Sequence, residues 1–360
     1  MIFVDASRYN NTPHRTGVEN YSFHLINALA KLAPEQTTLV SPRRVPLDVP
    51  QLILPFPRLW TQVRLSCEVL LSSRGVRRRG ATSITPDSTL FVPSHQMPIV
   101  HPANTVITIH DVAFKRFPEC YSLLSRLYLD WGARFACKSA KKIIVPSQVT
   151  KDDLIKWYKC DPAKVMVIPH GYSPLSVTLS AAKSPPVTNH PYFLFLGRIE
   201  RKKNLLTLIQ AFNQFHQTNP EWKLALAGKP GVGSYKILAA TKQNSAIELL
   251  GYVNEAVKIE LLKNASAFIF PSLYEGFGFP LLEAMEFNLP IIASDIHASR
   301  EVAGEAALFF DPSSIEELIS QMTRVANNPP PTNAYTQILA RYSWEECAKK
   351  TLNVLKNHIQ

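Results

Sequence analysis

The sequence predicts an α/β protein built from two doubly wound domains, and three observations support this fold class. Short apolar runs alternate with segments of helical apolar spacing along nearly the whole chain. The chain has 360 residues, of which 46% are hydrophobic, so it is about twice the size of a usual domain and can fill two cores. Between residues 172 and 190 the composition shifts to Ser, Pro, Ala and Thr, which is typical of a linker.

The first half begins with the apolar run 2–4, which is short enough to be a strand. Residues 21–32 follow with apolar side chains at helical spacing. The same criteria predict further strands at 38–40, 89–92, 105–109, 142–145 and 165–168, and helices at 123–139 and 149–157. This alternation predicts a parallel sheet covered on both faces.

The second half repeats the pattern after the linker. It predicts strands at 192–196, 223–227, 247–250, 267–270 and 290–293, and helices at 205–215, 256–263, 281–287, 315–326 and from 344 to about 355. We therefore expect a first domain at 1–173, a linker at 174–190 and a second domain at 191–340. The last helix, within 341–360, is expected to pack back toward the first domain. In doubly wound sheets ligands bind at the carboxyl ends of the strands, so a cleft between the domains is the expected site.

Composition excludes several classes of protein. No run of 18 apolar residues occurs, which argues against a transmembrane helix, and the first residues lack the features of a leader. The five cysteines are odd in number and lie outside the short spacings of metal ligands. We therefore expect a reduced, cytoplasmic chain without a disulfide framework or a zinc finger.

The positive charge is concentrated in one half. Residues 1–173 carry 22 Lys and Arg against 12 Asp and Glu, whereas residues 174–360 carry 17 against 16. A basic first half attracts phosphate in the form of nucleic acid, anionic lipid or a diphosphate substrate. Charge alone leaves these three alternatives open.

The densest chemical signal is the segment 271–285, PSLYEGFGFPLLEAM. A strand leads into a glycine-rich loop, and Pro280 stands where the first turn of a helix would begin. Glu275 and Glu283 are eight residues apart, so both carboxylates can face a ligand beside the free N–H groups of that helix. The alternative is a structural turn in which Glu283 only complements the helix dipole.

Three further segments follow predicted strands. FLGRIERKKNL at 195–205 offers a guanidinium and ammonium groups that suit a diphosphate, although the residue types alone favour a solvated basic turn without function. His110 and Asp111 end the strand 105–109, where a lone histidine is more often structural. Gly17 precedes a helix and either admits a ligand or simply opens that helix.

The segment 271–285 resembles the Glu-x7-Glu motif of retaining glycosyltransferases of family 4, which have the GT-B fold. Smaller similarities extend from the first strand to the Trp344 helix, so the resemblance covers almost the whole chain. It implies an enzyme that transfers a hexose from a nucleotide-diphosphate sugar to a hydroxyl group with retention of configuration. The sequence looks most like mannosyltransferases of bacterial polysaccharide assembly, which suggests GDP-mannose as the donor.

The resemblance also assigns residues of the second half. Glu275 lies by the donor sugar, and the loop formed by Phe277, Gly278 and Phe279 holds sugar hydroxyls and phosphate. In the same way Glu283 is expected to bind the ribose hydroxyls.

Arg198 and Lys203, five residues apart as in the family, are expected to neutralise the diphosphate. Val253 lies in the loop expected at the base. In the first half the resemblance places His110 at the reacting centre, and Gly17 where the donor phosphates or the acceptor approach. Asp111 is expected to orient His110 or its loop.

One departure from the family pattern and one missing motif bear on these expectations. Relatives usually have Asn where His170 stands, so the role of His170 is open. Asp-x-Asp is absent from the sequence. An enzyme that holds its donor through a metal would normally show such paired carboxylates. We therefore expect metal-independent transfer without a cofactor.

The segment 57–71 is a predicted amphipathic helix with Leu59, Trp60, Val63, Cys67, Leu70 and Leu71 on one side. It is followed by Arg74 and by Arg77, Arg78 and Arg79. A helix that packs on the core is the favoured interpretation, because relatives have a similar Trp-x-Gln helix. The alternative is a membrane-surface helix beside a basic patch, which would reach a lipid-linked acceptor at an anionic membrane.

The predicted function is therefore transfer of a hexose to a glycan or lipid-linked acceptor that binds mainly on the basic first half, at the cytoplasmic face of a membrane. A UDP-sugar donor such as UDP-glucose is the main alternative, followed by a nucleotide-sugar epimerase of the same fold and a non-catalytic relative. Binding to nucleic acid is not expected, because no recognised motif with interleaved aromatic residues accompanies the arginines.

Overall fold

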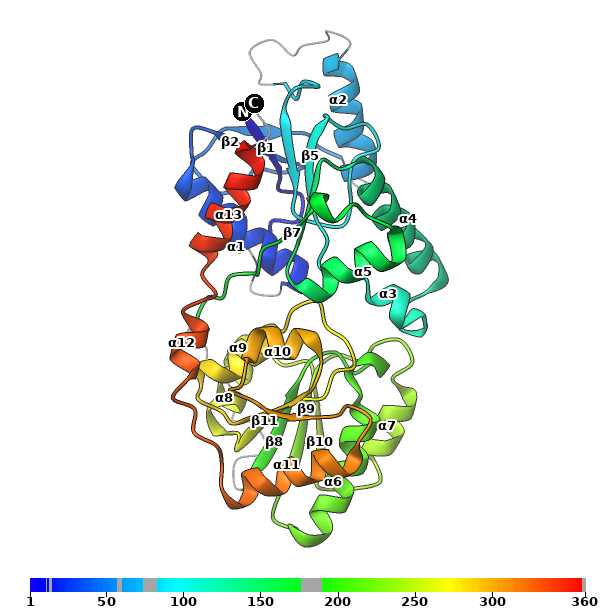
Figure 1. Ribbon diagram of the computed structural model, residues 1–360, viewed down its shortest axis with the longest axis vertical. Coiled ribbons are helices and arrows are strands. Elements are labelled where there is room, and N and C mark those ends of the chain that lie inside the picture. Colours follow the sequence, from blue (N-terminus) through cyan, green and yellow to red (C-terminus); the bar gives the residue numbers. More distant parts are fainter. Residues whose placement is uncertain (11, 13–14, 57–59, 74–82, 176–189, 358–360) are drawn as a thin grey trace. The chain divides into compact units, whose positions relative to one another are not determined.

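The computed structural model describes the chain except for residues 11, 13–14, 57–59, 74–82, 176–189 and 358–360. The chain forms two compact units (Figure 1). The first comprises residues 1–112, 127–171 and 342–360, and the second comprises residues 113–126 and 172–341. Each unit contains one parallel sheet with helices packed against it.

The first unit is built on a seven-stranded sheet with the order β3-β2-β1-β4-β5-β6-β7. All of its strand pairs are parallel. The strands are β1 (Ile2–Asp5), β2 (Thr37–Ser41), β3 (Gln51–Ile53), β4 (Thr89–Val92), β5 (Asn104–Thr108), β6 (Lys142–Val145) and β7 (Val165–Val167). Every residue of β1, β2 and β4 is buried, as expected for a sheet covered on both faces.

The longer helices of the first unit are α1 (Gly17–Leu32), α2 (Ser66–Ser73), α4 (Leu123–Ser139), α5 (Gln148–Tyr158) and α13 (Trp344–Lys356), of which α4 starts in the residues grouped with the second unit. A 3₁₀ turn spans Pro162–Lys164. Thr16 caps α1 in a capping box with Glu19. The C-terminal helix α13 packs along α1 (Figure 1). Gly171 makes this packing possible, because a Cβ there would lie 2.4 Å from the backbone nitrogen of Trp344.

The segment 60–73 differs from the single amphipathic helix predicted at 57–71. A π-helical turn, Trp60–Leu65, precedes α2, and its wider turn shifts the register of the following side chains relative to an α-helix. Trp60, Leu65 and Val69 face the core, whereas Val63 and Leu70 of the predicted apolar side are exposed, as are Cys67 and Leu71. The core-packing interpretation holds for Trp60, whose Nε1 donates to the Leu54 carbonyl at 2.7 Å. Leu59 and the arginines at 74, 77, 78 and 79 lie outside the described residues.

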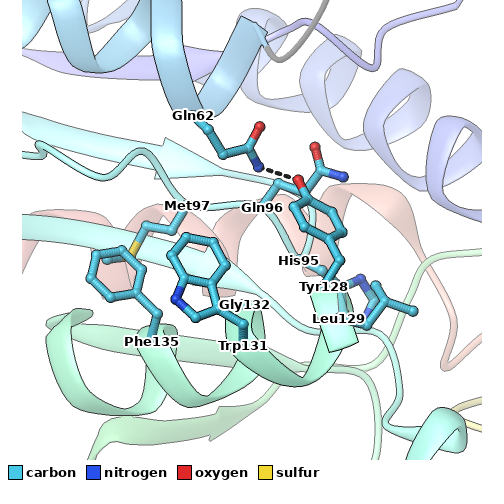
Figure 2. Close-up of a pocket in the computed structure, with 9 residues that line it drawn as sticks. All are labelled: Gln62, His95, Gln96, Met97, Tyr128, Leu129, Trp131, Gly132 and Phe135. Atoms are coloured by element: carbon cyan, nitrogen blue, oxygen red, sulfur yellow. Dashed lines mark hydrogen bonds between the residues drawn. The ribbon is translucent and has the colours of Figure 1, made fainter. Parts of the chain in front are cut away.

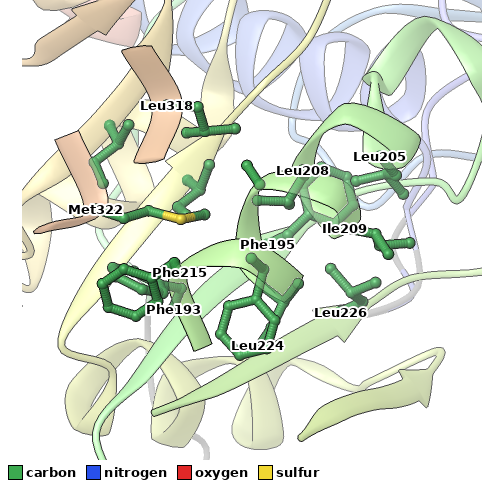
Figure 3. Close-up of a cluster of buried hydrophobic side chains, with 14 of the residues drawn as sticks. Phe193, Phe195, Leu205, Leu208, Ile209, Phe215, Leu224, Leu226, Leu318 and Met322 are labelled. Atoms are coloured by element: carbon green, nitrogen blue, oxygen red, sulfur yellow. The ribbon is translucent and has the colours of Figure 1, made fainter. Parts of the chain in front are cut away.

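The second unit is built on a six-stranded parallel sheet with the order β10-β9-β8-β11-β12-β13. The strands are β8 (Tyr192–Leu196), β9 (Lys223–Ala227), β10 (Ile247–Gly251), β11 (Ala267–Phe270), β12 (Ile291–Ser294) and β13 (Leu308–Phe310). Phe193 and Phe195 of β8 form an aromatic and aliphatic core with Leu208 of the next helix and Met322 (Figure 3).

The helices of the second unit are α3 (Ala113–Arg116), α6 (Leu205–Thr218), α7 (Tyr235–Thr241), α8 (Glu255–Asn264), α9 (Phe279–Glu286), α10 (His297–Ala303), α11 (Ile315–Asn327) and α12 (Tyr335–Leu339). Short 3₁₀ turns span Pro118–Cys120 and Arg201–Lys203. None of the helices in the described ranges is long and apolar enough to cross a membrane.

The predicted class, two parallel doubly wound sheets, is confirmed. Strands β4, β6, β8, β9 and β11 and helix α4 have the predicted bounds. The prediction missed β3, α3, α7, α10, β13 and α12, all of which are short. All five cysteines are free thiols.

Candidate active site

The sheet of the second unit brings most of the predicted residues to one edge. The central strand β8 lies between β9 and β11, and β10 follows β9. Since all six strands are parallel, the loops after them leave the sheet on the same side. Val253 follows β10, Arg198 and Lys203 follow β8, and Glu275 follows β11. The order along this edge is therefore Val253, then the two cations, then the glutamate.

Lys203 and Glu275 form an ion pair between the loops of neighbouring strands, with both side chains 13% exposed. The Oε1 of Glu275 also accepts a hydrogen bond of 2.6 Å from the hydroxyl of Ser272, which is fully buried. The two loops are joined at the backbone as well, because the amide of Leu273 donates to the carbonyl of Lys202 at 2.8 Å. Two contacts, one from each loop, therefore hold the carboxylate, and a backbone hydrogen bond joins the two loops.

Glu283 forms a second ion pair at this edge. Its Oε1 lies 2.6 Å from the Nζ of Lys258, which is on α8. The sequence analysis missed Lys258, because nothing in the local sequence of α8 shows that it faces α9. The pair fixes the direction of the Glu283 carboxylate, and both side chains stay partly exposed.

The remaining cations of the 198–203 segment differ in their surroundings. The Arg198 side chain is 64% exposed, and its Nε lies 3.8 Å from the Oε2 of Glu200, a long contact for an ion pair. Arg201 pairs with Glu119 at 3.3 Å, and Lys202 pairs with Glu200 at 3.5 Å. Arg198 thus presents an accessible guanidinium in the same segment as Lys203, whose side chain is largely buried.

The loop before α9 packs closely against the side chains of that helix because residue 278 is a glycine. Gly278 precedes the helix with φ of 150°, and a Cβ there would lie 3.2 Å from the Cδ1 of Leu281. The Phe277 and Phe279 rings meet edge to face at 5.2 Å, and Phe277 is buried. Pro280 occupies the first turn of α9, as predicted. The positive end of the α9 dipole lies at this turn and favours an anion.

The backbones that follow β8 and β9 also lie very close to each other. A Cβ on Gly228 would lie 1.7 Å from the carbonyl oxygen of Gly197, so only glycine fits there. Along the same edge, Val253 is half-buried and follows Tyr252, which is 51% exposed. The Nζ of Lys229 stands 4.4 Å from the centre of the Tyr252 ring.

His110 and Gly17 lie in the first unit, whereas the site residues described so far lie in the second. The Nδ1 of His110 is 3.2 Å from the Nε2 of His170, and the Tyr21 ring meets the His110 ring edge-on at 4.8 Å. Asp111 contributes its backbone carbonyl, which accepts from the Nε2 of His95 at 3.0 Å. Gly17 is the first residue of α1, one turn before Tyr21, and has open space where a Cβ would point.

The two hydrogen-bonded histidines are neutral. Burial, followed by the neighbouring His95, lowers the pKa of His110 to about 3. Burial and the neighbouring His110 also lower the pKa of His170 well below its usual range. One of the two facing nitrogens therefore carries a hydrogen and donates a hydrogen bond to the other. His170 thereby fixes the orientation of the His110 ring.

Within the described ranges, no group of three or more His, Cys, Asp or Glu side chains could hold a metal ion. The charged groups at the edge of the second sheet are cations and their glutamate partners. This arrangement suits an anionic ligand that also carries hydroxyl groups.

Comparison with known families identifies the family of this fold. Residues 15–174 match the family described as Glycosyltransferase Family 4, and residues 176–342 match the one described as Glycosyl transferases group 1. Together the two matches cover both sheets except β1. The chain belongs to the glycosyltransferases of family 4, with the GT-B fold.

Among curated proteins, the chain is 27% identical to O-antigen chain mannosyltransferase B of Escherichia coli over 269 residues, which is 70% of each chain. It is 25% identical to O-antigen chain mannosyltransferase RfbU of Salmonella typhimurium over 264 residues, which is 72% of this chain and 71% of RfbU. The chain therefore resembles bacterial polysaccharide mannosyltransferases, as the sequence motifs predict.

Solved structures agree on the fold. Sucrose-phosphate synthase from Thermosynechococcus elongatus superimposes with a TM-score of 0.69 at 18% identity, covering 99% of this chain and 98% of that one. HepE from Anabaena, solved with UDP and glucose, superimposes with a TM-score of 0.67 at 15% identity, covering 99% of this chain and all of that one.

Proposed function

We propose that this glycosyltransferase moves mannose from GDP-mannose to a hydroxyl group of a glycan or lipid-linked acceptor, with retention of anomeric configuration and without a metal. The similarity to two O-antigen mannosyltransferases supports the sugar and the type of acceptor. The basic excess in residues 1–173 supports an acceptor site there, at the cytoplasmic face of an anionic membrane.

The observation that carries the proposal is the Lys203–Glu275 ion pair at the edge of the second sheet. An ammonium group has three donors, so Lys203 can keep Glu275 and still bind a phosphate oxygen. Such a lysine binds the phosphate side of a sugar–phosphate bond while its partner carboxylate lies on the sugar side. The pair therefore brackets the bond that the reaction breaks.

The other residues of the edge take roles that follow from their charge and place. Arg198 and the positive end of the α9 dipole would meet the negative charge that develops on the leaving diphosphate. Glu283, oriented by Lys258, would accept hydrogen bonds from the ribose hydroxyls. Val253, at the far end of the edge, would contact the base. His110 would contact the donor sugar, with its ring oriented by His170.

The test is a thermal-shift panel of GDP, UDP and ADP and their sugar conjugates, with and without EDTA. A ligand that binds only the folded protein raises its melting temperature. We expect the largest shift with GDP and GDP-mannose, unchanged by EDTA. Loss of that shift in Lys203→Ala, but not in the matched basic variant Arg201→Ala, would tie it to the proposed site.

Two outcomes would redirect the proposal. A shift with UDP alone would favour a UDP-sugar donor, which the fold likeness to HepE, solved with UDP and glucose, keeps as the second candidate. Conversion of the donor to its epimer without an acceptor would indicate an epimerase. Retention itself is checked by the one-bond ¹³C–¹H coupling constant at the anomeric carbon of the first product formed, because the H1–H2 coupling is small in both anomers of a mannoside.

A further inference from the structure

The sheet of the first unit has a switch point that the proposed donor site does not use. Strands β2 and β3 lie on one side of β1, and β4 to β7 lie on the other. The chain therefore reverses its direction across the sheet between β1 and β4. In doubly wound sheets ligands bind at such a point, outside the carboxyl ends of the strands.

The loops after β1, β2 and β4 carry mainly positive charge. These loops, residues 6–16, 42–50 and 93–103, contain four arginines and a single acid, Asp48. Three of the arginines are exposed, and within the described part of the chain none of these three pairs with a carboxylate. Such a group of cations attracts an anionic ligand. We name three residues the arginine edge: Arg8, Arg43 and Arg44.

Arg8 stands at the switch point in a turn whose backbone is fixed. The amide of Tyr9 donates to the carbonyl of Ala6 at 3.0 Å, and the amide of Ala6 donates to the carbonyl of Val40 in β2 at 2.8 Å. The Nη2 of Arg8 donates to the Oε1 of Gln96 at 3.3 Å, so this side chain joins the loops after β1 and β4. A guanidinium has five donor hydrogens, so Arg8 keeps others for an anion.

The buried acid next to this turn does not neutralise Arg8. Asp5 ends β1 and is 1% exposed, and its carboxylate accepts from the amide of Ser7 at 2.8 Å and the hydroxyl of Thr61 at 3.1 Å. Burial raises the pKa of this carboxyl, and its hydrogen bonds and the Arg8 charge offset that only in part. Among the described residues, Arg8 has no carboxylate within ion-pair distance, so its charge is available to a ligand.

Further donors accompany Arg8. Gln62, Gln96 and Tyr128 meet at one small pocket (Figure 2). Because the Oε1 of Gln96 accepts from Arg8, the NH₂ group of Gln96 is the donor that remains. The Tyr128 hydroxyl accepts from Gln62 at 2.6 Å and keeps its own hydrogen. A set of donors around a cation suits an anion with several oxygen atoms.

The arginine edge and His110 lie at the same edge of this sheet. His95 precedes Gln96 in the loop after β4, and the ring centroids of His95 and His110 are 5.5 Å apart. Only β4 separates β1 from β5, the strand that leads to His110. Since neighbouring strands are about 5 Å apart, the ends of β1 and β5 are separated by about 10 Å. A sugar ring with its phosphate can bridge this span.

We propose that the arginine edge binds a phosphate group of the acceptor, with Arg8 as its main ligand. The proposal rests on the proposed function, because it specifies the acceptor as a sugar that carries a phosphate or diphosphate and turns a hydroxyl group toward His110. Guanidinium groups bind phosphate through two parallel hydrogen bonds, which fixes the orientation of the ligand as well as its charge. The phosphate of a membrane lipid has the same chemistry, so the experiment has to separate these two sources.

Isothermal titration calorimetry tests the site while saturating GDP keeps the donor site filled. The probes are glucose 1-phosphate and inorganic pyrophosphate, and glucose is the uncharged control. We expect both anions to bind and glucose not to bind. Arg8→Gln should weaken anion binding about tenfold. Arg8→Lys keeps the charge without the planar fork and should restore part of the affinity.

Gln96→Glu tests the same group without removing the arginine. It keeps the shape of the side chain but places a carboxylate beside Arg8, so it should weaken anion binding as strongly as Arg8→Gln. Arg134→Gln is the matched control, because Arg134 is 64% exposed and lies on α4, outside the three loops. We expect this variant to bind both anions like the wild type. Binding to vesicles of phosphatidylcholine and phosphatidylglycerol should be the same in Arg8→Gln and the wild type.

Three results would overturn the acceptor site. They are equal anion binding by Arg8→Gln and the wild type, no anion binding by the wild type once GDP is bound, and loss of vesicle binding in Arg8→Gln. The last result would make the arginine edge a contact for membrane lipids. Failure of the proposed function is seen separately, as the lack of any thermal response to nucleotides in a protein whose anion binding still depends on Arg8.

Discussion

The ammonium of Lys203 and the carboxylate of Glu275 are ion-paired across the loops that follow two neighbouring strands, β8 and β11. Both side chains are largely buried, so each neutralises a charge that would otherwise be costly to keep there. They are 72 positions apart in the chain, and the sheet brings them together because β8 lies next to β11. This pair links the phosphate side of the proposed donor site to its sugar side.

Replacing Lys203 by Ala is expected to lower kcat by about a hundredfold or more, because it removes a positive charge from the leaving diphosphate. It also leaves the Glu275 carboxylate without its cation, which should cost about 1–3 kcal/mol of unfolding free energy. Enzyme kinetics and urea unfolding measure the two effects. Glu275→Gln, which keeps the shape of the side chain, should lose activity with a smaller loss of stability.

Arg201→Ala is the control for Lys203, because Arg201 lies in the same turn and is 70% exposed. Its partner Glu119 is also accessible, so removing the pair should change stability by less than about 1 kcal/mol. If Arg201→Ala lost as much activity as Lys203→Ala, general loss of basic charge would explain both, and the specific role of Lys203 would be wrong.

Lys258→Met tests whether the second ion pair serves donor binding. Without Lys258 the Glu283 carboxylate is free to turn away from the ribose position, so the KM for the donor should rise about tenfold with little change in kcat. Lys263→Met is the matched variant on the same helix, since Lys263 pairs with Glu260 at the surface. Equal donor KM values for the two variants would argue against a role of Lys258.

Gly278→Ala tests the close approach of the loop before α9. A Cβ there meets Leu281 at 3.2 Å in a backbone conformation that favours glycine, so we expect a loss of about 1–3 kcal/mol together with loss of activity. Gly304 also has positive φ but open space around a Cβ. Gly304→Ala should therefore cost about 1–2 kcal/mol with activity intact. Full activity of Gly278→Ala would show that the loop tolerates displacement.

The sequence predicts this fold well because both sheets are buried on both faces, so each strand is a short apolar run such as β8 or β11. The elements it misses are the short ones, β13 and α10 among them, whose periodicity is too brief to detect. The π-helical turn at Trp60 changes the helical period, so the buried side of that segment could not be predicted from α-helical spacing.

The site shows the same limit. Glu275, Glu283 and Lys203 stand out because each lies in a dense local motif. Lys258 does not, since its role depends on a contact 25 residues away, between α8 and α9. His170 likewise gains its role from a hydrogen bond to a residue 60 positions earlier. Residues that orient other residues are visible only once the chain is folded.

Stability should fall as the pH drops below about 6.5, because His110 and His170 are buried in their neutral forms. Their folded pKa values are lowered, so the unfolded chain binds more protons in this range and acid favours unfolding. With a folded pKa of about 3, His110 alone should lower the unfolding free energy by about 2 kcal/mol at pH 5.

His170→Asn introduces an amide that can hydrogen-bond but does not titrate. The melting temperature of this variant should therefore fall less between pH 7 and pH 5 than that of the wild type. His190→Asn, an exposed site, should leave the pH slope unchanged. The same slope in both variants would show that the buried pair does not control this acid sensitivity.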